Sequence, residues 1–110
     1  MELREIKNEK GLVIGIRGRL DTTTYGILEK RLADLYEAGE KHIAVNCLDM
    51  DYVSSSGLRV LLIGLKRARL EQGRFVICCL RDNIREIFEI SGFSSIFEIF
   101  PTEEEALKTF

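Results

Sequence analysis

The chain has 110 residues, 45% of them hydrophobic and 31% charged, and a net charge of −2. This length predicts a single domain spanning 1–110, and the composition is typical of a folded globular protein. The near balance of 16 basic and 18 acidic residues gives no general attraction for nucleic acid. No apolar run reaches the roughly 18 residues that span a bilayer, so we expect a cytoplasmic protein that binds no membrane.

Alternating hydrophobicity predicts an antiparallel pair of strands at the start of the chain. Residues 3–7 alternate, and residues 12–20 alternate again after a turn. A helix is predicted next, because Asp21 is followed by three threonines that suit a helix start. Apolar residues then recur at helical spacing as far as Gly39, where the helix should end.

A strand–helix–strand unit occupies the middle of the sequence. The short apolar run 42–48 reads as a strand, and 57–71 has leucines along one helical face. The apolar run 74–80 follows and reads as a second buried strand. Two strands separated by a helix predict a right-handed parallel crossover. Three elements remain: a helix starting at Asp82, a short strand at 96–100, and a helix starting at Thr102 with glutamates in its first turn. The predicted fold class is α/β, a mixed and mostly parallel sheet with about four helices.

Three consecutive serines, residues 54–56, stand between the strand predicted at 42–48 and the next helix. The pattern puts Ser55 or Ser56 at or beside the helix N-cap. Unpaired N–H groups and the helix dipole favour an anion there, so a phosphoryl group of about −1.5 to −2 charge could be carried without disturbing the fold. The residues alone leave a simpler alternative open, in which the serines only cap the helix and line a turn.

Other candidates for catalysis or ligand binding are weak. His42 is the single histidine, and it lies at the far end of its predicted strand from the serines, a distance of about 17 to 20 Å. That separation argues against a Ser-His-acid arrangement. Asp49 and Asp51 are two carboxylates without further oxygen ligands, so no metal site is predicted. No glycine-rich phosphate loop follows a strand, and no cofactor is predicted.

The three cysteines are interpreted as small buried hydrophobic residues in a reducing compartment. Cys78 and Cys79 are neighbours in the strand predicted at 74–80, so they should point to opposite faces. Cys47 belongs to another strand, and the three lack the spacing of metal ligands.

Several segments together make the chain resemble the STAS domain family, in particular the free-standing bacterial anti-sigma factor antagonists. The resemblance covers nearly the whole chain. The segments that carry it are Gly18-Arg19-Leu20-Asp21, similar to the family's Gly-x-Leu-Asp, then Cys47-Leu48-Asp49, Val53-Ser54-Ser55-Ser56-Gly57-Leu58, Ile90-Ser91-Gly92-Phe93 and Thr102-Glu103-Glu104-Glu105-Ala106-Leu107.

The resemblance implies a partner switch. The unphosphorylated protein would bind an anti-sigma factor that is also a serine kinase, and so release a sigma factor. Phosphorylation by that kinase would turn the protein off, and a phosphoserine phosphatase would restore it. The acceptor maps onto Ser55, with Ser56 as second hydroxyl and Ser56 and Ser54 as alternative acceptors. The partner surface would comprise Asp21, Ser54, Ser55, Ser56 and Gly57. The family commonly has Asp where this chain has Ser54.

Two other functions remain as alternatives at this point. One is a STAS module that regulates or scaffolds a transport or stress-sensing complex without reversible phosphorylation. The other is a small nucleotide-hydrolysing enzyme. Asp21, for its part, could simply cap the first helix. The family resemblance favours a binding protein over an enzyme, without cofactor and monomeric when free.

Overall fold

The computed structural model describes residues 1–110 as a six-stranded sheet with helices on both of its faces. In chain order the elements are β1 (Glu2–Lys7), β2 (Leu12–Leu20), α1 (Tyr25–Glu37), β3 (His42–Asn46), β4 (Met50–Val53), α2 (Ser55–Leu70), β5 (Arg74–Cys78), α3 (Asp82–Ile90), a 3-10 turn (Phe93–Ser95), β6 (Glu98–Phe100) and α4 (Glu103–Leu107).

The sheet is mixed and mostly parallel, which confirms the predicted fold class. Its strand order is β1-β2-β3-β5-β6, and β4 joins the side of β2. Only the β1–β2 pair is antiparallel, as the alternating runs at the start of the chain predict. Strands β3 and β5 are parallel neighbours, as predicted, and the chain segment that connects them contains β4 as well as α2.

Strand β4 is the one element that the sequence pattern misses. Its four residues lie where we expected a loop, between the strand at 42–48 and the serines. Met50 and Val53 are buried and the two residues between them are exposed, so the period-two pattern is absent. Strand β2 changes neighbour to accept it, pairing with β3 along its first half and with β4 from Gly18 onward. Gly18 has φ of 97°, a conformation that favours glycine, at this change of neighbour.

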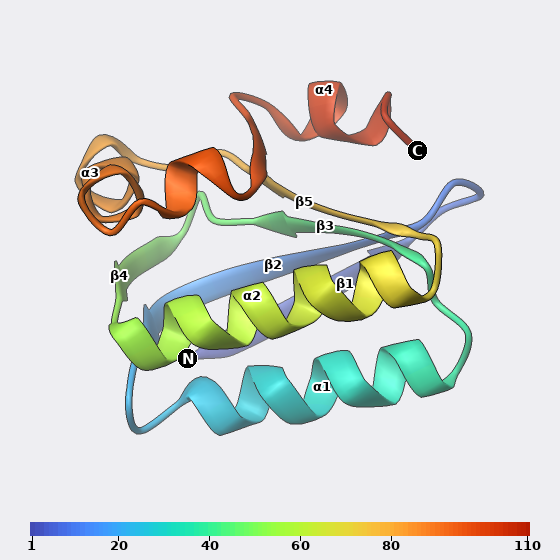
Figure 1. Cartoon of the computed structure of the whole chain (residues 1–110), viewed down its shortest axis with the longest axis horizontal. Coiled ribbons are helices and arrows are strands. Elements are labelled where there is room, and N and C mark those ends of the chain that lie inside the picture. Colours follow the sequence, from blue (N-terminus) through green and yellow to red (C-terminus); the bar gives the residue numbers. More distant parts are fainter.

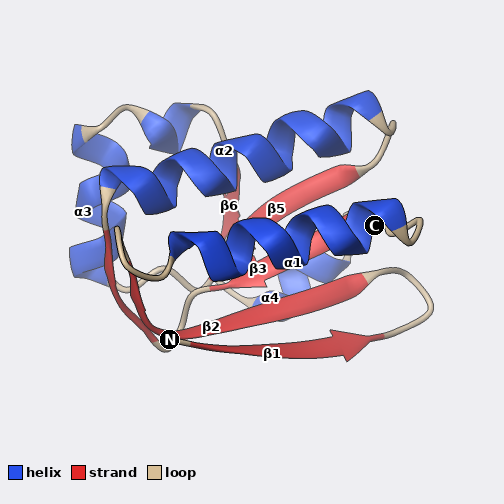
Figure 2. Cartoon of the chain, turned by 90° about the horizontal axis from the view of Figure 1, so that it is seen from below, coloured by secondary structure: helices blue, strands red, loops and turns tan.

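The layers follow from the alternation of strand side chains. Helices α1 and α2 lie side by side on one face, α4 lies on the other, and α3 sits near β4 at the end of the sheet (Figures 1 and 2). The larger core fills the space between α1, α2 and the sheet; its strand residues include Ile14, Ile16, Ile43, Val45, Phe75 and Ile77. A smaller core lies under α4 and consists of Val13, Ala44, Val76, Cys78 and Ala106. No helix has the length and apolar character needed to cross a membrane.

The cysteines are free, and two of the three are buried, as predicted. Burial raises the pKa of the Cys47 thiol to about 12. Cys79 differs from the prediction, because β5 ends at Cys78 and Cys79 has φ of 63°. The strand alternation therefore does not extend to Cys79, which is half-buried.

Candidate functional site

The carboxyl ends of β2 and β4 lie next to each other and bring two predicted site segments together. Leu20, the last residue of β2, is in register with Val53, the last residue of β4. The Ser54 N–H donates a hydrogen bond of 2.9 Å to the Leu20 carbonyl. Asp21, which follows β2, and the serines, which follow β4, therefore share one edge of the sheet. We call this edge, residues 19–24 with 52–57, the serine edge.

Helix α2 begins directly after β4 with a capped first turn. Ser54 is the N-cap, with extended backbone, and its Oγ accepts a 3.2 Å hydrogen bond from the Gly57 N–H. The sequence pattern favours Ser55 or Ser56 for this position, which is one or two residues too late. Ser55 is instead the first helical residue and is exposed, and Ser56 is half-buried. The difference arises because β4 carries regular structure up to Val53, leaving one residue between strand and helix.

Gly57 allows the start of α2 to rest against the end of β2. A Cβ at this position would lie 2.7 Å from both the Leu20 carbonyl oxygen and the Leu20 Cγ. It would also lie 3.0 Å from a methyl group of Val53. Gly57 belongs to the predicted partner surface, but it is buried and has no side chain to contact a partner. Its contribution is to allow the close packing of α2 on β2.

The Asp21 carboxylate organises the turn that leads into α1. Its Oδ1 accepts hydrogen bonds from the Thr23 N–H at 3.0 Å and the Thr23 Oγ1 at 2.8 Å, and its Oδ2 accepts one from Arg19 Nε at 3.2 Å. The hydrogen bonds from Thr23 lower the pKa of the Asp21 carboxyl to about 2. Asp21 lies three residues before the N-cap of α1, which is Thr24, and the Thr24 side chain makes no capping hydrogen bond.

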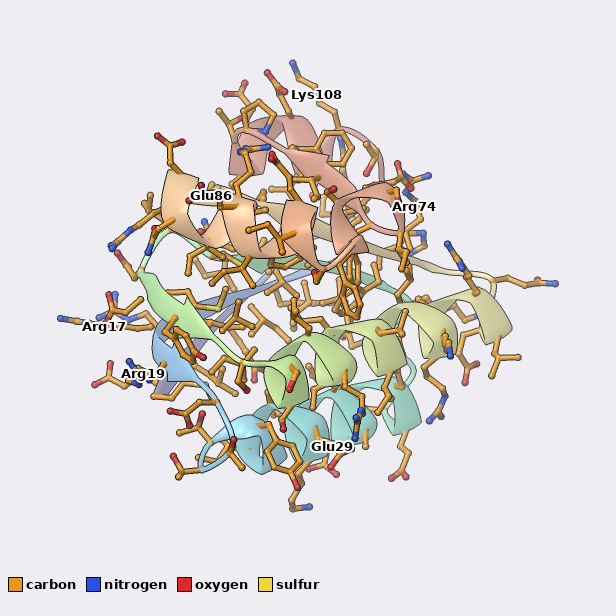
Figure 3. The ribbon with its side chains drawn as sticks, turned by 60° about the vertical axis from the view of Figure 1, so that its left-hand side comes forward. Arg17, Arg19, Glu29, Arg74, Glu86 and Lys108 are labelled. Atoms are coloured by element: carbon orange, nitrogen blue, oxygen red, sulfur yellow. The ribbon has the colours of Figure 1, made fainter.

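An exposed arginine and tyrosine stack beside the serines, a feature that the sequence does not reveal. Arg19 of β2 lies opposite Tyr52 of β4, and the guanidinium carbon is 4.4 Å from the ring centroid. Figure 3 shows Arg19 projecting outward with Arg17 from this end of the sheet. The pair becomes apparent only once β4 is placed beside β2. Arg and Tyr are residue types enriched among energetically important contacts at protein interfaces.

The two carboxylates considered as metal ligands face an arginine. Arg81 Nε donates a 2.6 Å hydrogen bond to the Leu48 carbonyl, and its other nitrogens lie 3.6 Å from Asp51 and 4.0 Å from Asp49. No three potential metal-ligating side chains of His, Cys, Asp or Glu gather in the chain. This network ties the β3–β4 loop to the start of α3.

His42 begins β3 at the opposite edge of the sheet. Its register places it beside the start of β2, while the serines lie beyond the end of β2. The eight residue-to-residue steps from Leu12 to Leu20 amount to roughly 26 Å of extended chain. His42 packs edge-on against Phe110, with ring centroids 5.4 Å apart. Proton transfer between His42 and the serines is not possible at this separation.

The chain matches a known family along nearly its whole length. The STAS domain family matches residues 1–106, and the chain belongs to this family. BtrV of Bordetella bronchiseptica, a protein provisionally named an anti-sigma factor antagonist, is 37% identical over 110 residues. That alignment covers 100% of this chain and 95% of BtrV.

Solved structures show the same fold at lower sequence identity. A protein from Thermotoga maritima, provisionally described as an anti-sigma factor antagonist, has a TM-score of 0.92 at 17% identity, covering 97% of this chain and 92% of that one. The Bacillus cell fate determinant SpoIIAA in its phosphorylated form has a TM-score of 0.76 at 20% identity, covering 98% of both chains. A second SpoIIAA structure, of the unphosphorylated form, describes SpoIIAA as an anti-sigma factor antagonist.

Proposed function

We propose that this protein is a cytoplasmic anti-sigma factor antagonist that works by partner switching. In its unphosphorylated form it binds an anti-sigma factor with serine kinase activity, and the sigma factor is released. That kinase phosphorylates Ser55 and thereby ends the interaction, and a phosphoserine phosphatase reverses the modification. The observation that carries the proposal is an exposed serine at the first position of α2, in a STAS domain related to BtrV along its whole length.

Among the three serines, Ser55 can take a phosphate at the lowest structural cost. The Ser55 side chain is exposed, and the first turn of α2 contains no acidic residue, so an added anion meets the positive end of the helix dipole. A phosphate on Ser54 would disturb the hydrogen bond to the Gly57 N–H. Ser56 is half-buried. These differences support Ser55 over the two alternatives.

The phosphate would lower the affinity for the partner and leave the fold unchanged. A phosphoserine adds about −1.5 to −2 charge at neutral pH. Placed on the serine edge beside Asp21, it would change the local field that a docked kinase meets. A loss of about 1.4 kcal/mol of binding free energy lowers affinity tenfold, and repelled charges at interfaces can cost more. A binding protein therefore needs no catalytic group of its own to act as a switch.

Phosphorylation by the cognate kinase tests the proposal. Incubation with the kinase and ATP should add one phosphate, which mass spectrometry of peptides should place on Ser55. The S55A variant should remain unlabelled, and S56A, as a matched control, should be labelled like the parent. Full labelling of S55A would contradict the acceptor assignment. A pull-down that recovers transport components and no kinase would instead support a scaffold role in a larger complex.

A further inference from the structure

Arg59 is a free cation one helical turn beyond Ser55. Both residues belong to α2 and both are exposed. Side chains four residues apart on a helix lie on the same face, about 5 to 6 Å apart at Cβ. Arg59 takes part in none of the salt bridges of the molecule, whereas Arg67 of the same helix pairs with Glu71 at 3.0 Å.

The helical neighbours of Arg59 offer it hydroxyls and no carboxylate. The residues three and four positions away are Ser56 and Ser55 on one side and Leu62 and Ile63 on the other. The acidic side chains at and near the serine edge already face other arginines: Asp21 faces Arg19, while Asp49 and Asp51 face Arg81. Modification of a serine in the first turn would therefore give Arg59 an anion within reach along α2.

We propose that Arg59 is the internal counter-ion of phosphorylated Ser55, an inference that rests on the proposed function. An arginine guanidinium binds phosphate oxygens through two parallel N–H donors, one of the strongest charge-assisted contacts in proteins. The bare protein presents Arg59 to its partner as an unpaired positive charge. The phosphorylated protein presents a phosphate held against that arginine. One modification thus adds an anion to the surface and withdraws a cation from it.

The arrangement also distinguishes Ser55 from the preceding serine. Ser54 lies outside the helix in extended conformation, and its hydroxyl accepts from the Gly57 N–H. It is five residues from Arg59, a spacing that does not place two side chains on one helical face. A phosphate on Ser54 should therefore not pair with Arg59, and it provides a control for the proposal.

The second ionisation of an installed phosphoserine reports the pairing directly. Phosphoserine can be placed at position 55 through an expanded genetic code, without the kinase, and its phosphorus resonance followed by NMR from pH 4 to 8. A nearby guanidinium favours the dianion, so the titration midpoint should lie a few tenths of a pH unit lower in the parent than in R59Q. The R69Q variant is the matched control, because Arg69 is exposed on the same helix and unpaired. Its midpoint should equal that of the parent.

Three outcomes would overturn the proposal. They are equal midpoints in the parent and R59Q, a shift in R69Q as large as that in R59Q, or a similar R59Q effect on phosphoserine at position 54. The difference between parent and R59Q should also shrink in 1 M NaCl, since salt screens exposed charges. The titration does not involve the kinase. A kinase that fails to label Ser55 would refute the proposed function, and the titration would still decide the Arg59 pairing.

Discussion

Two helix starts in this molecule are capped alike and charged differently. At α2, Ser54 Oγ accepts a hydrogen bond of 3.2 Å from the Gly57 N–H, and at α4, Thr102 Oγ1 accepts one of 3.1 Å from the Glu105 N–H. Beyond the cap they diverge. Three glutamates occupy the first turn of α4, whereas the first turn of α2 has no acidic residue.

The absence of permanent negative charge at the start of α2 fits the regulation proposed for Ser55. Negative charge near a helix N-terminus is stabilising, and α4 has that charge in its sequence. In α2 the first helical residue is Ser55, whose hydroxyl would become an anion only after modification. Under the proposed function, the stabilising charge is permanent at α4 and would be added by a kinase at α2, and substitutions at each end can test that difference.

The largest effect is expected from G57A at the start of α2. The new methyl group would lie 2.7 Å from a backbone oxygen of Leu20, which cannot move without disturbing β2. We expect the free energy of unfolding to fall by about 1 to 3 kcal/mol, near the upper end of that range. Urea denaturation measures it.

The matched glycine control is G26A in α1. A Cβ at Gly26 would meet nothing within 4 Å, so this variant should be as stable as the parent or slightly more stable. Equal stabilities for G57A and G26A would show that the start of α2 does not depend on close contact with β2.

The next effect is on binding, through S55D. An aspartate at Ser55 gives α2 the charge that α4 already has, so the melting temperature should stay the same or rise by a degree or two. Affinity for the cognate anti-sigma factor, measured by calorimetry, should fall at least tenfold. The control E104S changes the charge at the start of α4 and should leave affinity unchanged. Unaltered affinity in S55D would remove the proposed link between charge at this helix start and partner choice.

Removing the side-chain cap should affect α2 and α4 differently. We expect the losses in the free energy of unfolding to differ by about 1 kcal/mol or less. S54A removes the cap of a 16-residue helix that packs on the main core, so it should lower global stability by about 1 kcal/mol. T102A removes the cap of a five-residue helix near the end of the chain. It should mainly increase amide exchange in α4, because such short terminal elements open locally. A larger loss of global stability in T102A than in S54A would reverse this order.

The smallest effect concerns Asp21, at the other side of the serine edge. Its folded-state pKa is lowered from 3.8 to about 2, so its contribution to stability is complete above about pH 4 and is lost as the pH falls toward 2. The stability difference between the parent and D21N should be constant from pH 7 to about pH 4 and then shrink. Urea denaturation across this range measures it, and a difference that persists unchanged at pH 2 would contradict the hydrogen bonding described for Asp21.

Local patterns predict much of this fold because they act over short stretches. The apolar first half of β2 with the alternation that follows it and the leucine face of α2 identify these elements, and Thr102 is the cap of α4 as predicted. Strand β4 is missed because its four residues have no alternation and its existence depends on pairing with β2, some thirty residues earlier in the chain. That omission shifts the predicted helix cap and hides the stacking of Arg19 on Tyr52.

The double pairing of β2 affects how a partner would meet the serine edge. The hydrogen bond from the Ser54 N–H to the Leu20 carbonyl attaches the edge to a strand whose other half lies in the protein interior. Moving the serine edge would require breaking hydrogen bonds between β2 and its neighbouring strands. The edge is therefore already ordered, and a binding partner would lose little affinity to the entropic cost of ordering it. Recognition at this edge should therefore resemble the docking of a rigid surface, with amide exchange at Ser54 slow even before any complex forms.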